Sequence, residues 1–73
     1  MDIKRRIDET HSLTPTEQQL GRTALAMGER MRGTSIKEFA QAANVSVASI
    51  HRFCKKLGLE GFKELKIELA RAA

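Results

Sequence analysis

The 73-residue sequence predicts an all-α fold in a single small domain, spanning residues 1–73. Apolar residues recur three or four positions apart in each segment, which is the spacing of one face of a helix. Ser or Thr stands before several of these segments, where its side chain can cap the first turn of a helix. No stretch alternates polar and apolar residues in the manner of a half-buried strand.

Two helices are predicted in the N-terminal part of the chain. Ile3 and Ile7, four positions apart, indicate a short helix at the start. A second helix opens after Thr14, because Pro15 stands at its first position and a Glu follows three residues after the cap. Gly28 is expected to end this helix, with one more helical turn after it. The apolar positions of this segment share one face: Leu20, Ala24, Met27 and Met31.

Three more helices are predicted in the C-terminal part. Ser35 caps the first of them, which ends at Asn44, a residue type that accepts a left-handed backbone. Ser46 caps the next helix, and Gly58 ends it in the usual C-terminal manner. The last helix falls within residues 60–73. The inner faces of these last two helices are formed by Ile50, Phe53, Cys54 and Leu57 and by Phe62, Leu65 and Leu69.

The third and fourth helices have the residues that a helix-turn-helix requires for steric reasons. Ala40 supplies a small side chain where two steeply crossing helices touch, Asn44 suits the turn, and Val45 fills the corner. Four apolar residues close the interior of the motif: Phe39, Ala43, Ile50 and Phe53. A helix pair with a purely structural role could satisfy the same sterics, so the outward-facing residues have to decide between the two interpretations.

The fourth helix lies in a stretch, Phe39 to Leu59, that contains no Asp or Glu, although the chain has 9 acidic and 13 basic residues. At about 100° per residue, its apolar stripe faces inward and its outward side carries Ala48, Arg52 and Lys55, flanked by His51 and Lys56. A helix that enters the major groove by its first turns suits this pattern. Arg52 can pair with guanine or a phosphate, and the two lysines can neutralise phosphates. Double-stranded DNA is therefore the predicted partner.

Other classes of function have less support. One cysteine and two histidines fall short of a structural zinc site, and no catalytic grouping or phosphate loop occurs, so we expect no enzyme, metal or cofactor. No apolar run is long enough to span a membrane. The basic face could instead be solvated, and the chain could be a helical protein-interaction module that uses Ile67 and the first helix. Cys54 is expected to pack in the core rather than to sense redox state.

The segments "LTPTEQQ" and "TSIKEFAQAANVSVASIHRFCKKLGLEGFKELKIELA" resemble the N-terminal domain of the RpiR family of bacterial transcription regulators. The resemblance runs from about Leu13 to Ala70 and implies a five-helix, homeodomain-like, DNA-binding bundle. In full-length members a sugar-isomerase-like domain follows, which binds phosphorylated sugars and drives oligomerisation. The resemblance thus implies that residues 1–73 are the N-terminal fragment of a longer cytoplasmic, nucleoid-associated regulator of sugar or phosphosugar metabolism genes. That regulator would be a homodimer or a higher homo-oligomer, with a phosphosugar effector bound by the absent domain.

The recognition helix of the family corresponds by position to Ser46–Lys56. Val47 departs from the family pattern, which commonly has Glu or Pro there, and Met27-Gly28 replaces a frequent Asn-Pro helix stop. His51 stands where the family often has an aliphatic residue or Asn. The sequence does not decide whether His51 reads a base or is a solvated surface residue. The predicted DNA-contacting residues are Ser35, Ser46, Val47, Ala48, Ser49, His51, Arg52, Lys55 and Lys56.

Overall fold

The computed structural model describes residues 2–72, and within this range every regular element is helical. The elements follow one another as α1 (Ile3–Glu9), α2 (Pro15–Met27), the 3₁₀ helix η1 (Gly28–Gly33), α3 (Ile36–Ala43), α4 (Val47–Lys56) and α5 (Phe62–Ala72). The all-α prediction is confirmed, and so is the order of the five α-helices.

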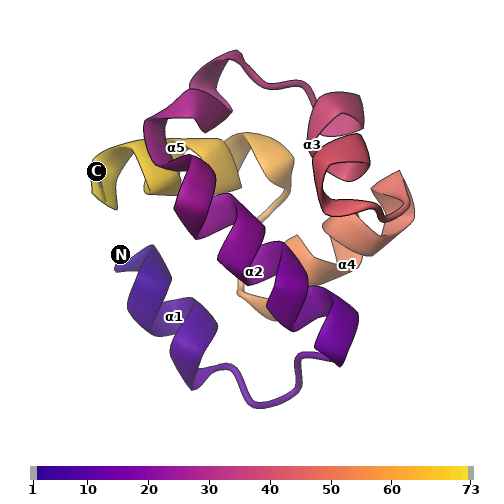
Figure 1. Ribbon diagram of the computed structural model, residues 1–73. Coiled ribbons are helices and arrows are strands. Elements are labelled where there is room, and N and C mark those ends of the chain that lie inside the picture. Colours follow the sequence, from indigo (N-terminus) through magenta and orange to yellow (C-terminus); the bar gives the residue numbers. More distant parts are fainter. Residues whose placement is uncertain (1, 73) are drawn as a thin grey trace.

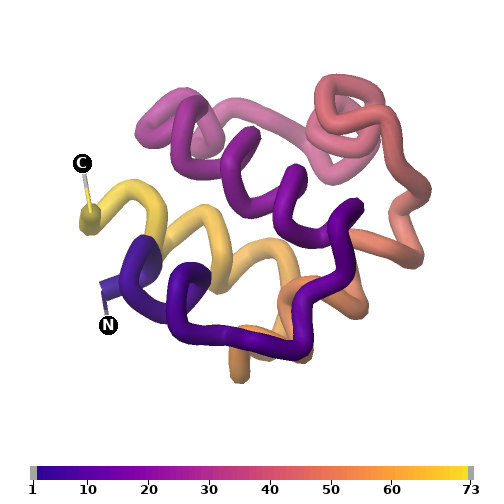
Figure 2. The backbone as a smooth tube through the Cα atoms, turned by 60° about the horizontal axis from the view of Figure 1, so that its bottom comes forward, coloured from indigo at the N-terminus to yellow at the C-terminus, as the bar shows by residue number. Residues whose placement is uncertain are grey.

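Helix α2 runs through the middle of the molecule, with α3 and α4 on one side and α1 on the other, while α5 passes behind η1 and the C-terminal end of α2 (Figure 1). The first and last helices lie side by side in both views (Figure 1, Figure 2). The core lies between these elements, and Leu20 and Ala24 of α2 are completely buried in it. The central position of α2 brings its first turn close to α4, which matters for the site described below.

The predicted caps are present at the starts of α2, α3 and α4. Thr14 Oγ1 accepts a hydrogen bond from the Glu17 N–H at 3.2 Å, while the Glu17 carboxylate accepts one from the Thr14 N–H at 2.8 Å. Ser35 and Glu38 repeat this reciprocal capping box at the start of α3. At α4 the Ser46 hydroxyl accepts from the backbone of the third helical residue.

The turn between α3 and α4 has the conformation that the sequence predicts. Asn44 lies in the left-handed region, with φ 57° and ψ 48°. The Val45 N–H donates to the Ala40 carbonyl at 2.9 Å, and the Asn44 N–H donates to the Gln41 carbonyl at 3.2 Å. Together these bonds form a Schellman motif, which satisfies the last carbonyls of α3 and turns the chain directly into α4.

Helix α4 ends in the same way. Gly58 has φ 81°, and the Leu59 N–H donates to the Cys54 carbonyl at 2.9 Å. Leu59 is 2% exposed, so the hydrophobic contact that accompanies this motif is also present. Both ends of the predicted recognition helix are therefore set by backbone geometry that its flanking residues dictate.

The core contains nearly all the residues that helical spacing placed there. Met27 and Phe62 are the departures, since both are only half-buried against the core. Met27 is the last residue of α2, and Gly28 with φ 53° turns the chain into η1, whose Met31 is completely buried instead. Cys54 is completely buried, as expected for a packing role, and this burial raises the pKa of its thiol to about 11.

Candidate nucleic-acid interface

The solvent side of α4 carries most of the predicted contact residues. Within this helix no residue is acidic. Of the predicted contact residues from Ser46 to Lys56, two are half-buried, Val47 and Ser49. The others are exposed: Ser46, Ala48, His51, Arg52, Lys55 and Lys56. Val47 packs partly against the core, so less of its side chain is available to a ligand.

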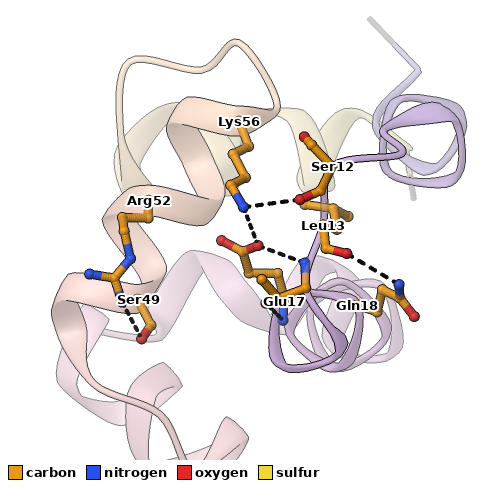
Figure 3. Close-up of polar contacts among 8 residues, drawn as sticks. Ser12, Leu13, Glu17, Gln18, Ser49, Arg52 and Lys56 are labelled. Carbon is orange, nitrogen blue, oxygen red and sulfur yellow. Dashed lines mark hydrogen bonds and ion pairs between the residues drawn. The ribbon is translucent and has the colours of Figure 1, made fainter.

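A row of polar side chains follows the first two turns of α4. The Ser46 and Ser49 hydroxyls lie 2.9 Å apart, and Arg52 Nη2 donates to Ser49 Oγ at 3.3 Å. This contact directs the Arg52 guanidinium towards the N-terminal half of the helix, as Figure 3 shows. The bond uses one of the five N–H donors of the guanidinium. Arg52 is thus oriented towards the helix end that enters a groove in helix-turn-helix docking.

Lys56 points in another direction, towards the start of α2 (Figure 3). Its Nζ donates to Glu17 Oε1 at 2.7 Å and to the Ser12 carbonyl at 3.0 Å. Burial acts to raise the pKa of Glu17, but the hydrogen bonds from Lys56 and Thr14 outweigh it and hold that pKa below its ordinary value. The two lysines at the end of α4 therefore differ, because only Lys55 is directed into solvent without this ion pair.

The first turn of α2 borders the basic face, which the sequence reasoning missed. A hollow of about 340 Å³ lies between the two helices. Its walls are formed by Thr14, Thr16, Glu17, Ser49, Arg52 and Lys56. A signal for this contact exists in the sequence, since Glu17 stands three positions before the buried Leu20, on the inner face of α2. An acid on a buried stripe requires a cationic partner.

The C-terminal end of α4 is held by α1. Arg6 Nη1 donates to the Leu57 carbonyl at 2.8 Å, across 51 positions of sequence. A cation at a helix C-terminus is favoured by the helix dipole. No local pattern predicts this contact, because it depends on how α1 packs.

Ser35 is the one predicted contact residue outside the α4 segment. It is exposed at the N-cap of α3, and its hydroxyl accepts a hydrogen bond from the Glu38 N–H at 3.1 Å. The structure therefore places this residue at the opposite end of α3 from the turn, with its hydroxyl engaged in capping.

A tight left-handed turn, two short helices and an acid-free basic face on the second helix define a DNA-binding helix-turn-helix domain. The model of the helix-turn-helix domain of the rpiR family matches residues 1–73. The chain belongs to this family, whose helix-turn-helix domains occur in transcriptional regulators.

Relatives agree with this assignment. The chain is 37% identical over 70 residues to the HTH-type transcriptional regulator HexR of Pseudomonas aeruginosa, covering 96% of this chain and 24% of that protein. It is 42% identical over 59 residues to the uncharacterized HTH-type regulator TTE0211 of Caldanaerobacter subterraneus, covering 81% of this chain and 21% of that protein. The chain therefore spans less than a quarter of the length of these relatives.

A solved structure has the same fold. The crystal structure of the N-terminal domain of ybbH from Bacillus subtilis superposes with a TM-score of 0.83 at 34% identity, covering 96% of this chain and 87% of that one. Of the helices formed by residues 2–72, none is long and apolar enough to cross a membrane. In the same range no three His, Cys, Asp or Glu side chains are grouped as metal ligands.

Proposed function

We propose that this chain binds double-stranded DNA sequence-specifically, with the N-terminal half of α4 in the major groove. The observation that carries the proposal is the exposed, acid-free face of α4, on which Arg52 is held against Ser49 near the start of the helix. An acidic side chain on that face would be repelled by the phosphates. The face is clear of such residues although the chain has 9 of them.

The predicted contact residues have different roles in this proposal. Arg52 reads a base edge, because its position near the middle of α4 lets a long side chain reach into the groove. Lys55 lies almost a turn later, where a helix inserted by its N-terminus leaves the groove, and it contacts a phosphate. Ser35, which is exposed at the N-terminus of α3, contacts the sugar-phosphate backbone of the DNA. The start of α4 contributes the remaining groove contacts, from Ser46, Val47, Ala48, Ser49 and His51.

Replacing Arg52 and Lys55 separately tests this division of roles. Arg52→Ala should weaken binding to a cognate duplex by ~1–3 kcal/mol and relax the base preference at one position. Lys55→Ala should weaken binding to all duplexes similarly and reduce the slope of log affinity against log salt by about 0.9. The measurement is fluorescence anisotropy across a salt series, with a duplex selected from a random library and a scrambled duplex of equal composition.

Other results would change the assignment. Equal losses on cognate and scrambled duplexes for Arg52→Ala would make Arg52 a phosphate anchor and would move base reading to the start of α4. Unchanged binding by both variants would leave the basic face as a solvated surface. A helical protein-interaction module would then be the better interpretation, and its affinity for a partner should hardly depend on salt, whereas DNA binding should fall steeply with it.

We infer a wider role from family membership. The chain supplies the DNA-binding domain of a bacterial transcription regulator of sugar or phosphosugar metabolism, acting in the cytoplasm at the nucleoid. The regulator binds a phosphosugar effector through a separate domain and assembles as a homodimer or a higher oligomer. Two-fold symmetry would match two half-sites about one helical turn apart. DNA selection with the full-length protein tests this, because the selected sites should be palindromic and should lie beside such genes.

A further inference from the structure

Glu17 is a buried carboxylate that faces the basic side of α4. It is 5% exposed, and its Oε1 accepts hydrogen bonds both from the Thr14 N–H at 2.8 Å and from Lys56 Nζ at 2.7 Å. The capping role explains the first of these contacts. The second joins two helices across 39 positions of sequence and is not needed to cap α2.

The pair changes the charge that α4 presents to a ligand. Lys56 is part of the basic face by position, but its ammonium lies against a carboxylate that is almost completely buried. Such a carboxylate is stable only while a cation compensates it, since an unpaired buried charge is strongly unfavourable. Turning Lys56 towards a phosphate would leave Glu17 uncompensated. The pair therefore contributes no net charge, and Arg52 and Lys55 remain as the outward-facing cations of α4.

The same contacts fix where α4 lies. Lys56 is anchored at Glu17 and at the Ser12 carbonyl, while the Arg6 guanidinium holds the Leu57 carbonyl at the next residue of the chain. These bonds connect the C-terminal end of α4 to both α2 and α1. Its N-terminal half carries the hydrogen-bonded row of Ser46, Ser49 and Arg52. A base contact depends on this placement much more than a phosphate contact does.

We propose that Glu17 is a positioning and specificity-determining residue of the DNA interface, which holds Lys56 away from the phosphates and fixes α4 against α2. The inference rests on the proposed DNA-binding function. Binding to any sequence depends on the number of phosphates neutralised, whereas discrimination depends on how the base-reading side chains are placed. Withholding one cation lowers binding to every sequence alike, whereas anchoring the helix favours discrimination, so the anchoring by Glu17 is the effect that increases the preference for the cognate site.

Glu17→Gln separates this role from capping. Gln at the third helical position can also form a capping box with Thr14, so the start of α2 is retained while the negative charge is lost. Lys56 is then released and gains a phosphate. The slope of log affinity against log salt on a scrambled duplex should become steeper by about 0.9. At about 0.1 M salt that extra contact strengthens binding to both duplexes roughly eightfold relative to about 1 M salt. The cognate-to-scrambled ratio should fall as well, because α4 is no longer anchored at Glu17.

Two further variants complete the design. Lys56→Gln removes the cation itself, so the cognate-to-scrambled ratio should fall while the salt slope stays at the wild-type value. Glu9→Gln is the matched charge control. Like Glu17, Glu9 accepts a hydrogen bond from a basic side chain at 2.7 Å, but its partner is Arg5 and the pair is exposed on α1. This control should leave the ratio unchanged. All proteins are compared by circular dichroism and measured well below their melting temperatures, with the selected and scrambled duplexes described above.

The outcomes distinguish the inference from the function on which it rests. If the wild-type chain shows no salt-dependent DNA binding, the proposed function itself fails. If it binds DNA and Glu17→Gln has the wild-type slope and ratio, Glu17 is a capping residue only and the inference is overturned. If Lys56→Gln lowers the salt slope by about 0.9, Lys56 contacts a phosphate in the complex and the inference is again overturned. A loss of stability alone would change neither the slope nor the ratio.

Discussion

Asn44 shows how one side chain determines the geometry of the DNA-binding motif. It is the only described residue other than glycine with a positive φ, at 57°. Asn tolerates this region because its short polar side chain strains the backbone less than a β-branched one does. The conformation lets the Val45 N–H reach the Ala40 carbonyl, which closes α3 and aims α4 across it.

Substitutions at this turn should follow backbone tolerance rather than polarity. Asn44→Gly should fold normally, since Gly adopts the left-handed region without steric cost. Asn44→Val should lose at least ~1 kcal/mol of unfolding free energy, because a β-branched residue is strained there. Thermal and urea unfolding of the two variants measures the difference. Equal melting temperatures would contradict the role of the left-handed backbone.

At the scale of elements, α2 has two functions, because it forms the centre of the core and also places α4. Its buried face includes Leu20 and Ala24, while Glu17 in its first turn holds Lys56. Helix α1 packs closely against its middle, where a Cβ added to Gly21 would lie 2.8 Å from Ile7 Cγ2. The position of α1 matters for the interface because this helix also carries Arg6 to the end of α4.

Gly21→Ala should therefore destabilise the protein, even though Ala is the better helix former by about 1 kcal/mol. The added methyl group crowds Ile7 Cγ2, which is fixed close to the backbone of α1 and cannot rotate away cheaply. Overpacking of this kind costs about 1–3 kcal/mol, so we expect a net loss of ~1 kcal/mol in unfolding free energy. Chemical unfolding measures it.

Gly33→Ala is the matched control for this substitution. A Cβ at Gly33 meets nothing within 4 Å, so the change should have little effect. A gain in stability from Gly21→Ala would show that helix propensity outweighs the close approach of α1 to α2.

At the scale of the whole molecule, two different faces are candidate interaction surfaces. The side formed by α4 and the start of α2 has one ion pair and the outward-facing Arg52 and Lys55. A second hollow, of about 400 Å³, lies on α5 and η1 around Ile67, which is 46% exposed. Ile67 is the residue that the protein-interaction interpretation of the sequence uses, and its exposure keeps this face available for that interpretation.

The stability of the molecule should depend on pH through Glu17 and Glu38. The pKa of each carboxyl is lowered from 4.5. Hydrogen bonds with Ser35 lower the pKa of Glu38. Burial acts to raise the pKa of Glu17, but the hydrogen bonds from Lys56 and Thr14 outweigh it. A carboxyl with a lowered pKa in the folded state contributes stability that is present above its unfolded value and is lost as pH falls through the folded value. We therefore expect the free energy of unfolding to decrease below about pH 4.5.

Urea unfolding at a series of pH values measures this dependence. Glu17→Gln and Lys56→Gln should each make the decrease shallower, because each removes the ion pair that lowers the pKa of Glu17. A slope identical to that of the wild-type chain in both variants would show that the ion pair does not contribute to acid sensitivity.

Local features of the sequence were sufficient to predict the helices and the motif. Thr14, Ser35 and Ser46 mark helix starts because a short hydroxyl side chain bonds the exposed N–H groups of the first turn. Asn44 and Gly58 mark helix ends because few residue types accept the left-handed region. Helical spacing then separated the buried stripe of α4 from its basic face, since the period of 3.6 residues is independent of tertiary context.

The tertiary structure alone decided which basic side chains of α4 face solvent and how α4 is held. Lys55 and Lys56 are adjacent in sequence, yet only Lys56 reaches the buried Glu17 on α2. Arg6 reaches Leu57 across most of the chain. Such contacts depend on the packing angles and distances of helices, which the periodicity within a single helix does not contain. The sequence by itself therefore determined that the second helix of the motif is basic, and the packing of α1 and α2 decided how that helix is oriented and how much of its charge is presented.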